Sequence, residues 1–332
     1  MTLRLVFNRD DLARVRLAES PDPMWELVLS SHLARDRGVP PQYLPWLRRA
    51  KQRAGSSEQA QEWLRTLFAL VPPQGGFPDF LTPAPTTTHH EAGCERIACT
   101  ARSRLRSDLG AAFGDRDVPT WVRSLADGDR DALHSVVRAV RGAHDALVAP
   151  QWHQIRRTVA ADRETRLDAL ARGGVHELLA GTPTVTGWDG TVLETAYPST
   201  RAVDLAGRGL TLVPSYFCVG TPVTWIDPEL PPVLIYPAAP VPEPGEGRPA
   251  SPRLVALLGR TRAECLVALS APRTTSDLAT RLDCSIGTAS KQAAVLRESG
   301  LISSDRRGGA VLHSLTRLGT ALLTAGQTGT DP

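Results

Sequence analysis

Residues 237–252 limit the fold of this chain more than any other segment. They read PAAPVPEPGEGRPASP, with six prolines and two glycines among sixteen residues. Proline fixes φ and lacks a backbone donor, so this segment can form neither a regular helix nor a central strand. We therefore predict a linker over residues 238–252, and the length of 332 residues agrees with a chain of about two domains.

The two sides of this linker differ in composition. All seventeen aromatic residues lie at or before Tyr236. Residues 253–323 contain ten Lys and Arg against five acidic residues, whereas the first 252 residues carry a net charge of −1. A local excess of positive charge beside a nearly neutral region is typical of a module that binds an anionic partner.

The N-terminal side begins with helical patterns. Asp22 followed by Pro23 predicts an N-cap and a first-turn proline. Between residues 130 and 149 the apolar residues recur every three or four positions, which predicts an amphipathic helix. Its apolar stripe consists of Leu133, Val136, Val137, Val140 and Leu147. We expect a mostly helical region over residues 1–180.

The pattern changes near residue 182. Short runs rich in Val, Thr, Leu and aromatic residues, separated by Gly, Pro and Asp, predict strands. These runs cover residues 184–188, 191–197, 210–217 and 233–236. We expect a small β-rich segment over residues 181–237 that completes the N-terminal domain. The predicted fold class is α+β, mainly α with a small antiparallel sheet.

The region after the linker shows helix signals in a fixed order. Apolar residues at helical spacing predict a first helix over residues 254–269. Thr274, with Asp277 three positions later, forms a capping-box pattern that opens a short second helix. Ser285 is the expected N-cap of a third helix over about residues 286–299.

The third helix has an apolar face and a polar face. Ala289, Ala293 and Leu296 are expected in the core. The opposite face has small polar side chains and one lysine, so it can enter a DNA major groove about 12 Å wide and meet phosphates and base edges. The candidate DNA-contacting residues on this helix are Ser285, Gly287, Thr288, Ser290, Lys291 and Gln292.

Two predicted strands follow, over residues 301–304 and 310–315, with the basic turn 305–309 between them. Arg306 and Arg307 in this turn are candidate contacts to DNA phosphates. Helix, capped helix, turn, helix, strand, basic turn and strand follow one another in this order. The order resembles the winged helix-turn-helix of the ArsR-type bacterial transcription regulators.

The resemblance covers about residues 254–323 and implies a C-terminal winged helix-turn-helix domain over residues 253–325. It implies that Ser285 to Leu296 form the recognition helix and that residues 305–309 form the wing. It also implies a homodimer that binds double-stranded DNA, usually as a repressor released by an effector. The paired-cysteine motif of the metal-sensing members is missing at the start of the second helix, so we do not infer metal sensing.

The N-terminal region resembles the long N-terminal region that a subset of these regulators carries. The motifs concerned are LVPP at 70–73, FPDFLTP at 77–83 and GRGLTLVPS at 207–215. We expect this region to supply dimer surface and to be the place for a small-molecule effector. The seven tryptophans are either core residues or the walls of an effector pocket.

Two other function classes stay open at this point. One is a protein-interaction adaptor whose winged helix binds a protein, and the other is an enzyme with a regulatory winged helix. The chain contains no G-x-S-x-G, H-E-x-x-H, phosphate-loop or G-x-G-x-x-G motif. We therefore predict a protein that is not an enzyme and that needs no cofactor.

His89, His90, Glu91 and Cys94 form a compact cluster of potential metal ligands. Their spacing fits no structural zinc pattern, so we interpret them as an exposed loop entering a helix and predict no metal site. The five cysteines are odd in number and predict reduced thiols. A charged N-terminus without an apolar core, and no run of ~18 apolar residues, predict a cytoplasmic protein without membrane contact.

Overall fold

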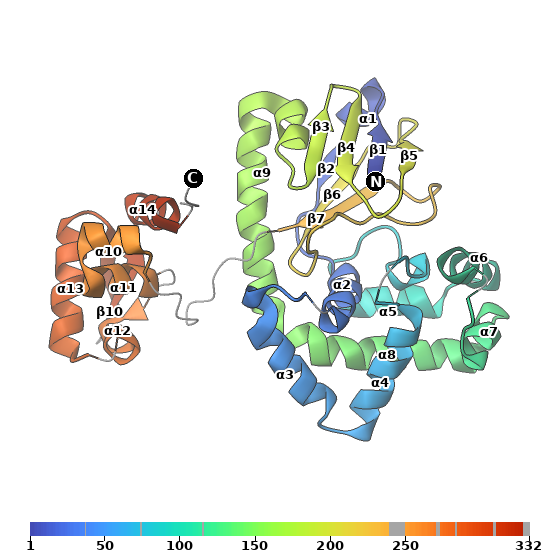
Figure 1. Cartoon of the computed structure of the whole chain (residues 1–332), viewed down its shortest axis with the longest axis horizontal. Helices are drawn as coiled ribbons and strands as arrows, with labels where there is room; N and C mark the ends of the chain where they lie inside the picture. The colour runs from blue at the N-terminus through green and yellow to red at the C-terminus, as the bar shows by residue number, and fades with distance from the viewer. Residues whose placement is uncertain are drawn as a thin grey trace. The chain divides into compact units, whose positions relative to one another are not determined.

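The computed structural model divides the chain into two compact units, unit 1 over residues 1–241 and unit 2 over residues 242–332 (Figure 1). The structure describes residues 1–36, 38–73, 75–114, 116–238, 250–269, 273–282, 284–307 and 310–327. For residues 41, 306, 307, 310, 317 and 324–327 it describes the backbone alone. Most of the predicted linker, residues 238–252, lies outside the described residues and stays a prediction.

Helices make up most of the first 180 residues of unit 1. They are α1 (Arg9–Ala13), α2 (Pro23–Arg35), α3 (Leu44–Ala54), α4 (Glu58–Leu70), α5 (His90–Ala98), α6 (Arg102–Phe113), α7 (Thr120–Ala126), α8 (Arg130–Leu147) and α9 (Trp152–Ala180). Short 3-10 turns lie at Pro41–Tyr43, Asp79–Leu81 and Ala149–Gln151. No helix in the described part of the chain combines the length and the apolar character that a membrane crossing requires.

Helices α2 and α8 lie at the centre of this helical part (Figure 1). The Asp22 carboxylate accepts hydrogen bonds from the backbone N–H of Met24 at 2.8 Å and of Trp25 at 3.3 Å, so the predicted cap of α2 is confirmed. The predicted apolar stripe of α8 is buried as well. Gly142 lets α8 approach α4 closely, because a Cβ at this position would overlap the Trp63 ring.

Unit 1 contains strands β1 (Thr2–Val6), β2 (Arg16–Leu17), β3 (Val185–Trp188), β4 (Val192–Ala196), β5 (Arg201–Asp204), β6 (Thr211–Ser215) and β7 (Val233–Pro237). They form one sheet in the order β3-β4-β1-β5 and another in the order β2-β6-β7. The α+β class is therefore confirmed.

The prediction of a single small antiparallel sheet is wrong in the number of sheets and in strand direction. Unit 1 has two sheets, and both contain parallel pairs. The β1–β5 pair is parallel, and so are both pairs of the sheet β2-β6-β7. The physical reason is connectivity: the chain crosses from β6 to β7 through residues 216–232 instead of turning back in a tight hairpin. The expected helical region 1–180 also contributes β1 and β2 to these sheets.

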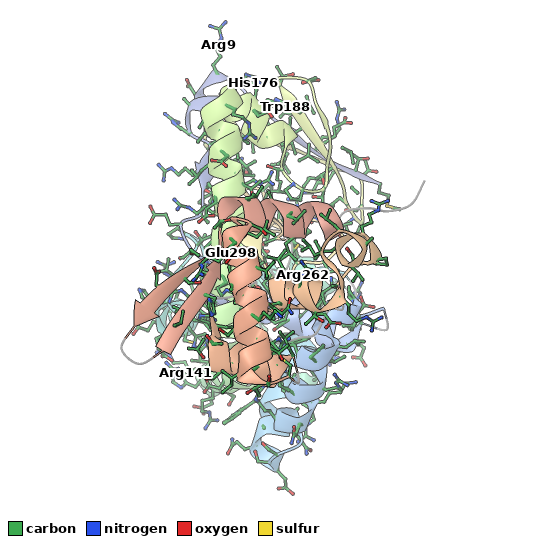
Figure 2. The ribbon with its side chains drawn as sticks, turned by 90° about the vertical axis from the view of Figure 1, so that its left-hand side faces the viewer. Arg9, Arg141, His176, Trp188, Arg262 and Glu298 are labelled. Atoms are coloured by element: carbon green, nitrogen blue, oxygen red, sulfur yellow. The ribbon has the colours of Figure 1, made fainter. Side chains whose placement is uncertain are left out.

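Helix α9 packs against both sheets of unit 1 (Figure 1). Its helical geometry is interrupted near Gly174, whose φ of +66° is readily adopted by glycine alone. Beyond this interruption, Leu178 is buried in a core that it shares with Leu193 of β4. Trp188 of β3 donates its indole N–H to Nδ1 of His176 at 3.1 Å, and the two rings lie side by side (Figure 2).

Unit 2 contains α10 (Pro252–Leu258), α11 (Arg260–Ala268), β8 (Arg273–Thr274), α12 (Thr275–Arg281), α13 (Ile286–Glu298), β9 (Ile302–Arg307), β10 (Ala310–Leu315) and α14 (Arg317–Gln327). The strands form an antiparallel sheet in the order β8-β10-β9. The predicted strand pair after the third helix is therefore confirmed. The single helix predicted over residues 254–269 is instead two helices, because the chain turns at Gly259 with a φ of +78°.

Candidate nucleic-acid interface

Helix α13 starts at a capped N-terminus. The Ser285 hydroxyl accepts a hydrogen bond from the backbone N–H of Thr288 at 3.1 Å and lies 2.9 Å from the Thr288 hydroxyl. This satisfies one of the donors that a helix start leaves without an intrahelical partner. The predicted cap is confirmed, and it fixes the first turn of α13.

One face of α13 anchors the helix in the core of unit 2. Ala289, Ala293 and Leu296 are at most 1% exposed, as the apolar spacing predicted. They share this core with Leu278 of α12 and Leu266 of α11. The alanines are small, so α13 lies close to its neighbours and its orientation in the unit is fixed by packing.

The opposite face of α13 is open. Ser285, Gly287, Thr288, Ser290 and Lys291 are exposed, and Gln292 is half-buried. No acidic residue occurs between residues 285 and 292. The structure thus brings six of the eight predicted site residues together on one surface, which carries a single positive charge.

Ile286 is an exposed apolar side chain that the predicted site residues did not include. Its side chain is 59% exposed in the first turn of α13, beside Gly287. A Cβ added at Gly287 would have the Ser285 hydroxyl as its nearest neighbour, at 3.8 Å. The backbone of this turn is therefore accessible, with one apolar side chain next to it. The helical pattern of the sequence could have revealed Ile286, because it places this residue outside the core positions.

Strands β9 and β10 form the hairpin that follows α13. Arg306 pairs with Val311 and Arg307 pairs with Ala310, so both arginines occupy the last two rungs before the turn. The predicted turn 305–309 is therefore shorter, since residues 305–307 belong to β9. The side chains of Arg306 and Arg307 lie outside the described part of the structure.

His313 connects this hairpin to α12. The imidazole is 6% exposed, with Nδ1 2.8 Å from the Ser304 hydroxyl and Nε2 3.0 Å from the Thr275 hydroxyl. Burial, and to a smaller extent the charge of Arg297, lowers the pKa of His313. The ring bridges β9 to the first residue of α12, so the hairpin is held at a fixed position beside the helices.

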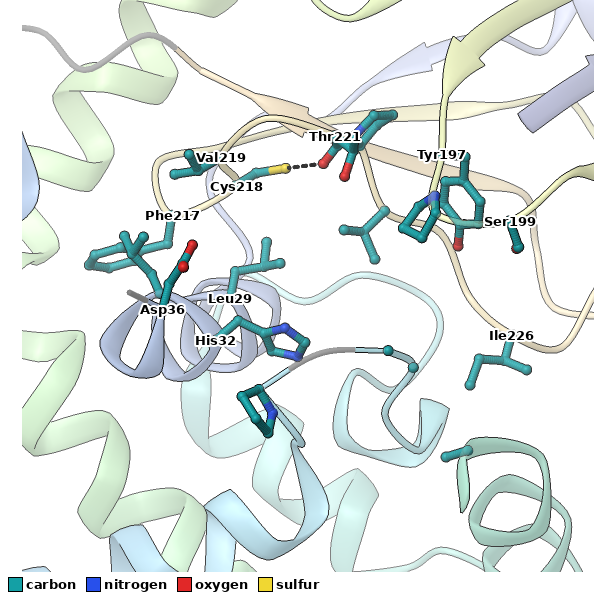
Figure 3. Close-up of a pocket in the computed structure, with 18 of the residues that line it drawn as sticks. Leu29, His32, Asp36, Tyr197, Ser199, Phe217, Cys218, Val219, Thr221 and Ile226 are labelled. Carbon is teal, nitrogen blue, oxygen red and sulfur yellow. Dashed lines mark hydrogen bonds between the residues drawn. The ribbon is translucent and has the colours of Figure 1, made fainter. Parts of the chain in front are cut away.

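Unit 1 contains a cavity of about 580 Å³, within the size range of small-molecule sites. Residues of α2 and of the segment that follows β6 line it. At one side the Cys218 thiol donates a hydrogen bond to the Thr221 carbonyl oxygen at 3.5 Å (Figure 3). Apolar and polar groups share the lining, among them Leu33, Phe217, Val223, Tyr197 and Ser199. No tryptophan lines this cavity, and Trp25, Trp46 and Trp225 are buried in the core.

His32 is the polar group of this cavity that stands out. Its Nε2 is buried and has no hydrogen-bond partner among the described residues. Burial, together with the charge of Arg35, lowers the pKa of His32 to about 4, so the ring is neutral near pH 7. The imidazole of His32 faces the cavity (Figure 3). No local sequence pattern points to His32, because the cavity walls come from segments almost 200 residues apart.

No family model, no curated protein sequence and no solved structure matches this chain.

Proposed function

We propose that this protein is a sequence-specific, DNA-binding transcription regulator that acts as a homodimer. In this proposal unit 2 is a winged helix-turn-helix of the ArsR type, with α13 as the recognition helix and the β9–β10 turn as the wing. The observation that carries the proposal is the exposed face of α13 over residues 285–292, which has no carboxylate and whose other side is fixed in a core.

The chemistry of this face suits base readout in the major groove. Small side chains at Gly287 and Ser290 permit close approach of the backbone to base edges. The exposed Ile286 offers an apolar contact for a thymine methyl group. Lys291 can donate to guanine O6 and N7, and the amide of Gln292 can pair with adenine.

Phosphate contacts fix the orientation in this proposal. The N-terminus of α13 favours an anion, because the free N–H groups of a first turn and the helix dipole both attract negative charge. Arg306 and Arg307 sit at the end of the hairpin, where a wing meets the DNA backbone. The His313 contacts hold this hairpin against α12, so wing and recognition helix would approach DNA as one body.

A homodimer follows from the small size of the module. One recognition helix offers few base contacts, and a symmetric pair doubles them across two half-sites about one helical turn apart. The proposed effector is a small molecule that binds the cavity of unit 1, where the unused Nε2 of His32 offers a hydrogen bond.

The test compares the only two lysines of the chain. Lys291 is exposed on α13, and Lys51 is exposed on α3, so Lys51→Ala is a matched control for charge and size. Fragments selected from the host genome by the purified chain are labelled, and their affinity is measured by fluorescence anisotropy at several salt concentrations. Lys291→Ala should cost about 1–3 kcal/mol of binding if it contacts a base, or lower the salt slope by about one if it contacts a phosphate.

Lys51→Ala should bind as the wild type does. Equal affinity of Lys291→Ala and wild type at every salt concentration would remove Lys291 from the interface. Absence of any salt-dependent DNA binding, together with a protein captured by unit 2, would replace this proposal by the adaptor function.

A further inference from the structure

Three side chains with metal-binding atoms meet on helix α5 of unit 1. His90, Glu91 and Cys94 each offer one such atom, and all three atoms lie within 4.8 Å of one another. Cys94 is fully buried, and the His90 side chain is 13% exposed. The prediction of an exposed loop at these residues is therefore wrong for His90 and Cys94. The helix begins at His90, one turn before Cys94, and brings the two side chains together.

The distance between the two buried ligand atoms fits a single metal ion. Nε2 of His90 lies 3.5 Å from Sγ of Cys94. A tetrahedral zinc ion with bonds of about 2.3 Å to sulfur and about 2.0–2.1 Å to nitrogen separates these two ligands by about 3.6 Å. An ion could therefore contact both atoms without a change in the helix.

The Arg141 guanidinium orients the Glu91 carboxylate. Arg141 of α8 donates to Oε2 of Glu91 from Nε at 3.1 Å, and its Nη2 lies 2.9 Å from the same oxygen. The other oxygen, Oε1, lies 3.8 Å from Nδ1 of His90, whereas Nε2 is the ring nitrogen that faces Cys94, so Glu91 must turn about its side-chain bonds to reach an ion held at Nε2. Arg141 thus holds one oxygen of the carboxylate and leaves the other beside the imidazole, as outer partners of metal ligands do.

His144 of α8 covers the cluster. Its ring stacks on that of His90, with centroids 3.8 Å apart and planes 13° apart. Its buried Nδ1 has no hydrogen-bond partner among the described residues, and it lies 3.6 Å from an oxygen of the Asp145 carboxylate. Because the two rings are parallel, they cannot direct ring nitrogens at one ion in this conformation. We therefore count His144 as a neighbour of the cluster and not as a ligand.

From this geometry we propose that His90, Glu91 and Cys94 bind one divalent transition-metal ion, with zinc as the best fit to the nitrogen, oxygen and sulfur donors. A water molecule would take the fourth position. On binding, the Cys94 thiol loses its proton to the solvent and the sulfur coordinates as thiolate. Since the ligands lie on α5 and Arg141, which contacts Glu91, lies on α8, the ion would stabilise the contact between these two helices.

The experiment uses the full metal-free chain and Co²⁺ as a spectroscopic probe of the site. Titration should give one Co²⁺ per chain, with the near-ultraviolet band of a cobalt–thiolate bond and the strong visible bands of tetrahedral cobalt. Zn²⁺ should displace the cobalt and raise the unfolding temperature of unit 1, because an ion that binds only the folded state stabilises it. Tryptophan fluorescence reads this unfolding, since all seven tryptophans precede residue 226.

Matched variants decide which residues hold the ion. Cys94→Ser should abolish the cobalt–thiolate band, whereas Cys99→Ser, at an exposed cysteine five residues further on, should retain it. His90→Gln should weaken binding by about tenfold or more, and the exposed neighbour His89→Gln should bind as the wild type does.

The His90→Gln variant keeps the test decisive if Cys94→Ser does not fold, because His90 lies at the edge of the core. The absence of a cobalt–thiolate band in the folded wild type would overturn the proposal. So would binding that survives His90→Gln unchanged or that is lost in Cys99→Ser. None of these results depends on DNA binding by unit 2, so this site and the proposed function can fail separately.

Discussion

Glu26 of α2 ties the helical part of unit 1 to the end of β6. The carboxylate is 1% exposed and accepts hydrogen bonds from the Ser215 hydroxyl at 3.0 Å, from the Tyr216 N–H at 2.9 Å and from the Phe217 N–H at 3.0 Å. Burial raises the pKa of Glu26 from 4.5 to about 7, although these three hydrogen bonds act in the opposite direction. Since Phe217 lines the cavity, Glu26 also positions part of its wall.

We predict that Glu26→Gln removes a large part of the pH dependence of unit 1. Because the pKa of Glu26 is raised in the folded state, the stability linked to it is complete below about pH 4.5 and is lost as the pH rises to about 7. The difference between 4.5 and about 7 corresponds to roughly 3 kcal/mol of unfolding free energy. Relative to the variant, the wild type should therefore lose roughly 3 kcal/mol between about pH 4 and about pH 8.

The assay is urea unfolding followed by tryptophan fluorescence at a series of pH values. All tryptophans belong to unit 1, so the signal reports this unit alone. Asp79, with a pKa raised to about 6 by burial, and His32, with a pKa lowered to about 4, also make stability depend on pH. They are present in both proteins, so their effects cancel in the difference.

Glu62→Gln, at an exposed glutamate of α4, is the control and should show the pH dependence of the wild type. If the stability difference between wild type and Glu26→Gln were constant across this pH range, the assignment of a raised pKa to Glu26 would be refuted.

Two further predictions concern packing. Gly142→Ala should destabilise unit 1 by about 1–3 kcal/mol in urea unfolding, because the added Cβ overlaps Trp63 and must push α4 from α8. Gly110→Ala in α6 meets no atom within 4 Å and should be neutral or stabilising, so equal effects of the two changes would contradict the packing argument. His313→Ala should cost unit 2 about 1–3 kcal/mol by calorimetry, because the half-buried hydroxyls of Thr275 and Ser304 lose their partner. An unchanged unfolding temperature of unit 2 would show that the hairpin is held by other contacts.

The helices of this protein could be predicted because their signals are local. The Asp22 cap, the stripe of α8 and the Ser285 cap each depend on residues within a few positions of one another, and the structure places them as expected. Buried polar residues inside such helices were less evident. Glu26 stands in an apolar run, and its partners on and after β6 are about 190 residues away.

The sheets show the limit of local patterns. Strand β1 alternates buried and exposed residues from Leu3 to Val6, a signal of a strand that the helical reading of residues 1–180 missed. Its partners, β4 and β5, lie beyond residue 190. The residue pattern near β1 does not indicate whether each pair is parallel or antiparallel. Strand direction depends on the path of the whole chain, so it could not be read from the runs themselves.

The candidate interface was more predictable than the cavity or the cluster on α5. Helical periodicity alone separates buried Ala289 from exposed Lys291, so the open face of α13 follows from the sequence. The cavity requires α2 to meet the segment after β6, a long-range contact. The cluster was visible in the sequence as neighbouring residues. That His90 and Cys94 meet depends on where helix α5 begins, and that Arg141 orients Glu91 depends on the packing of α8 against α5.

The most direct test is a selection of host genomic fragments by the purified full chain. It is run in parallel with a variant in which Thr288, Ser290 and Lys291 are all alanine. The wild type should enrich a small set of fragments that share an inverted repeat, with half-sites about one helical turn apart, and the variant should enrich none of them. Enrichment of the same fragments by both proteins, or of none by the wild type, would contradict the assignment of α13 as a DNA-reading helix.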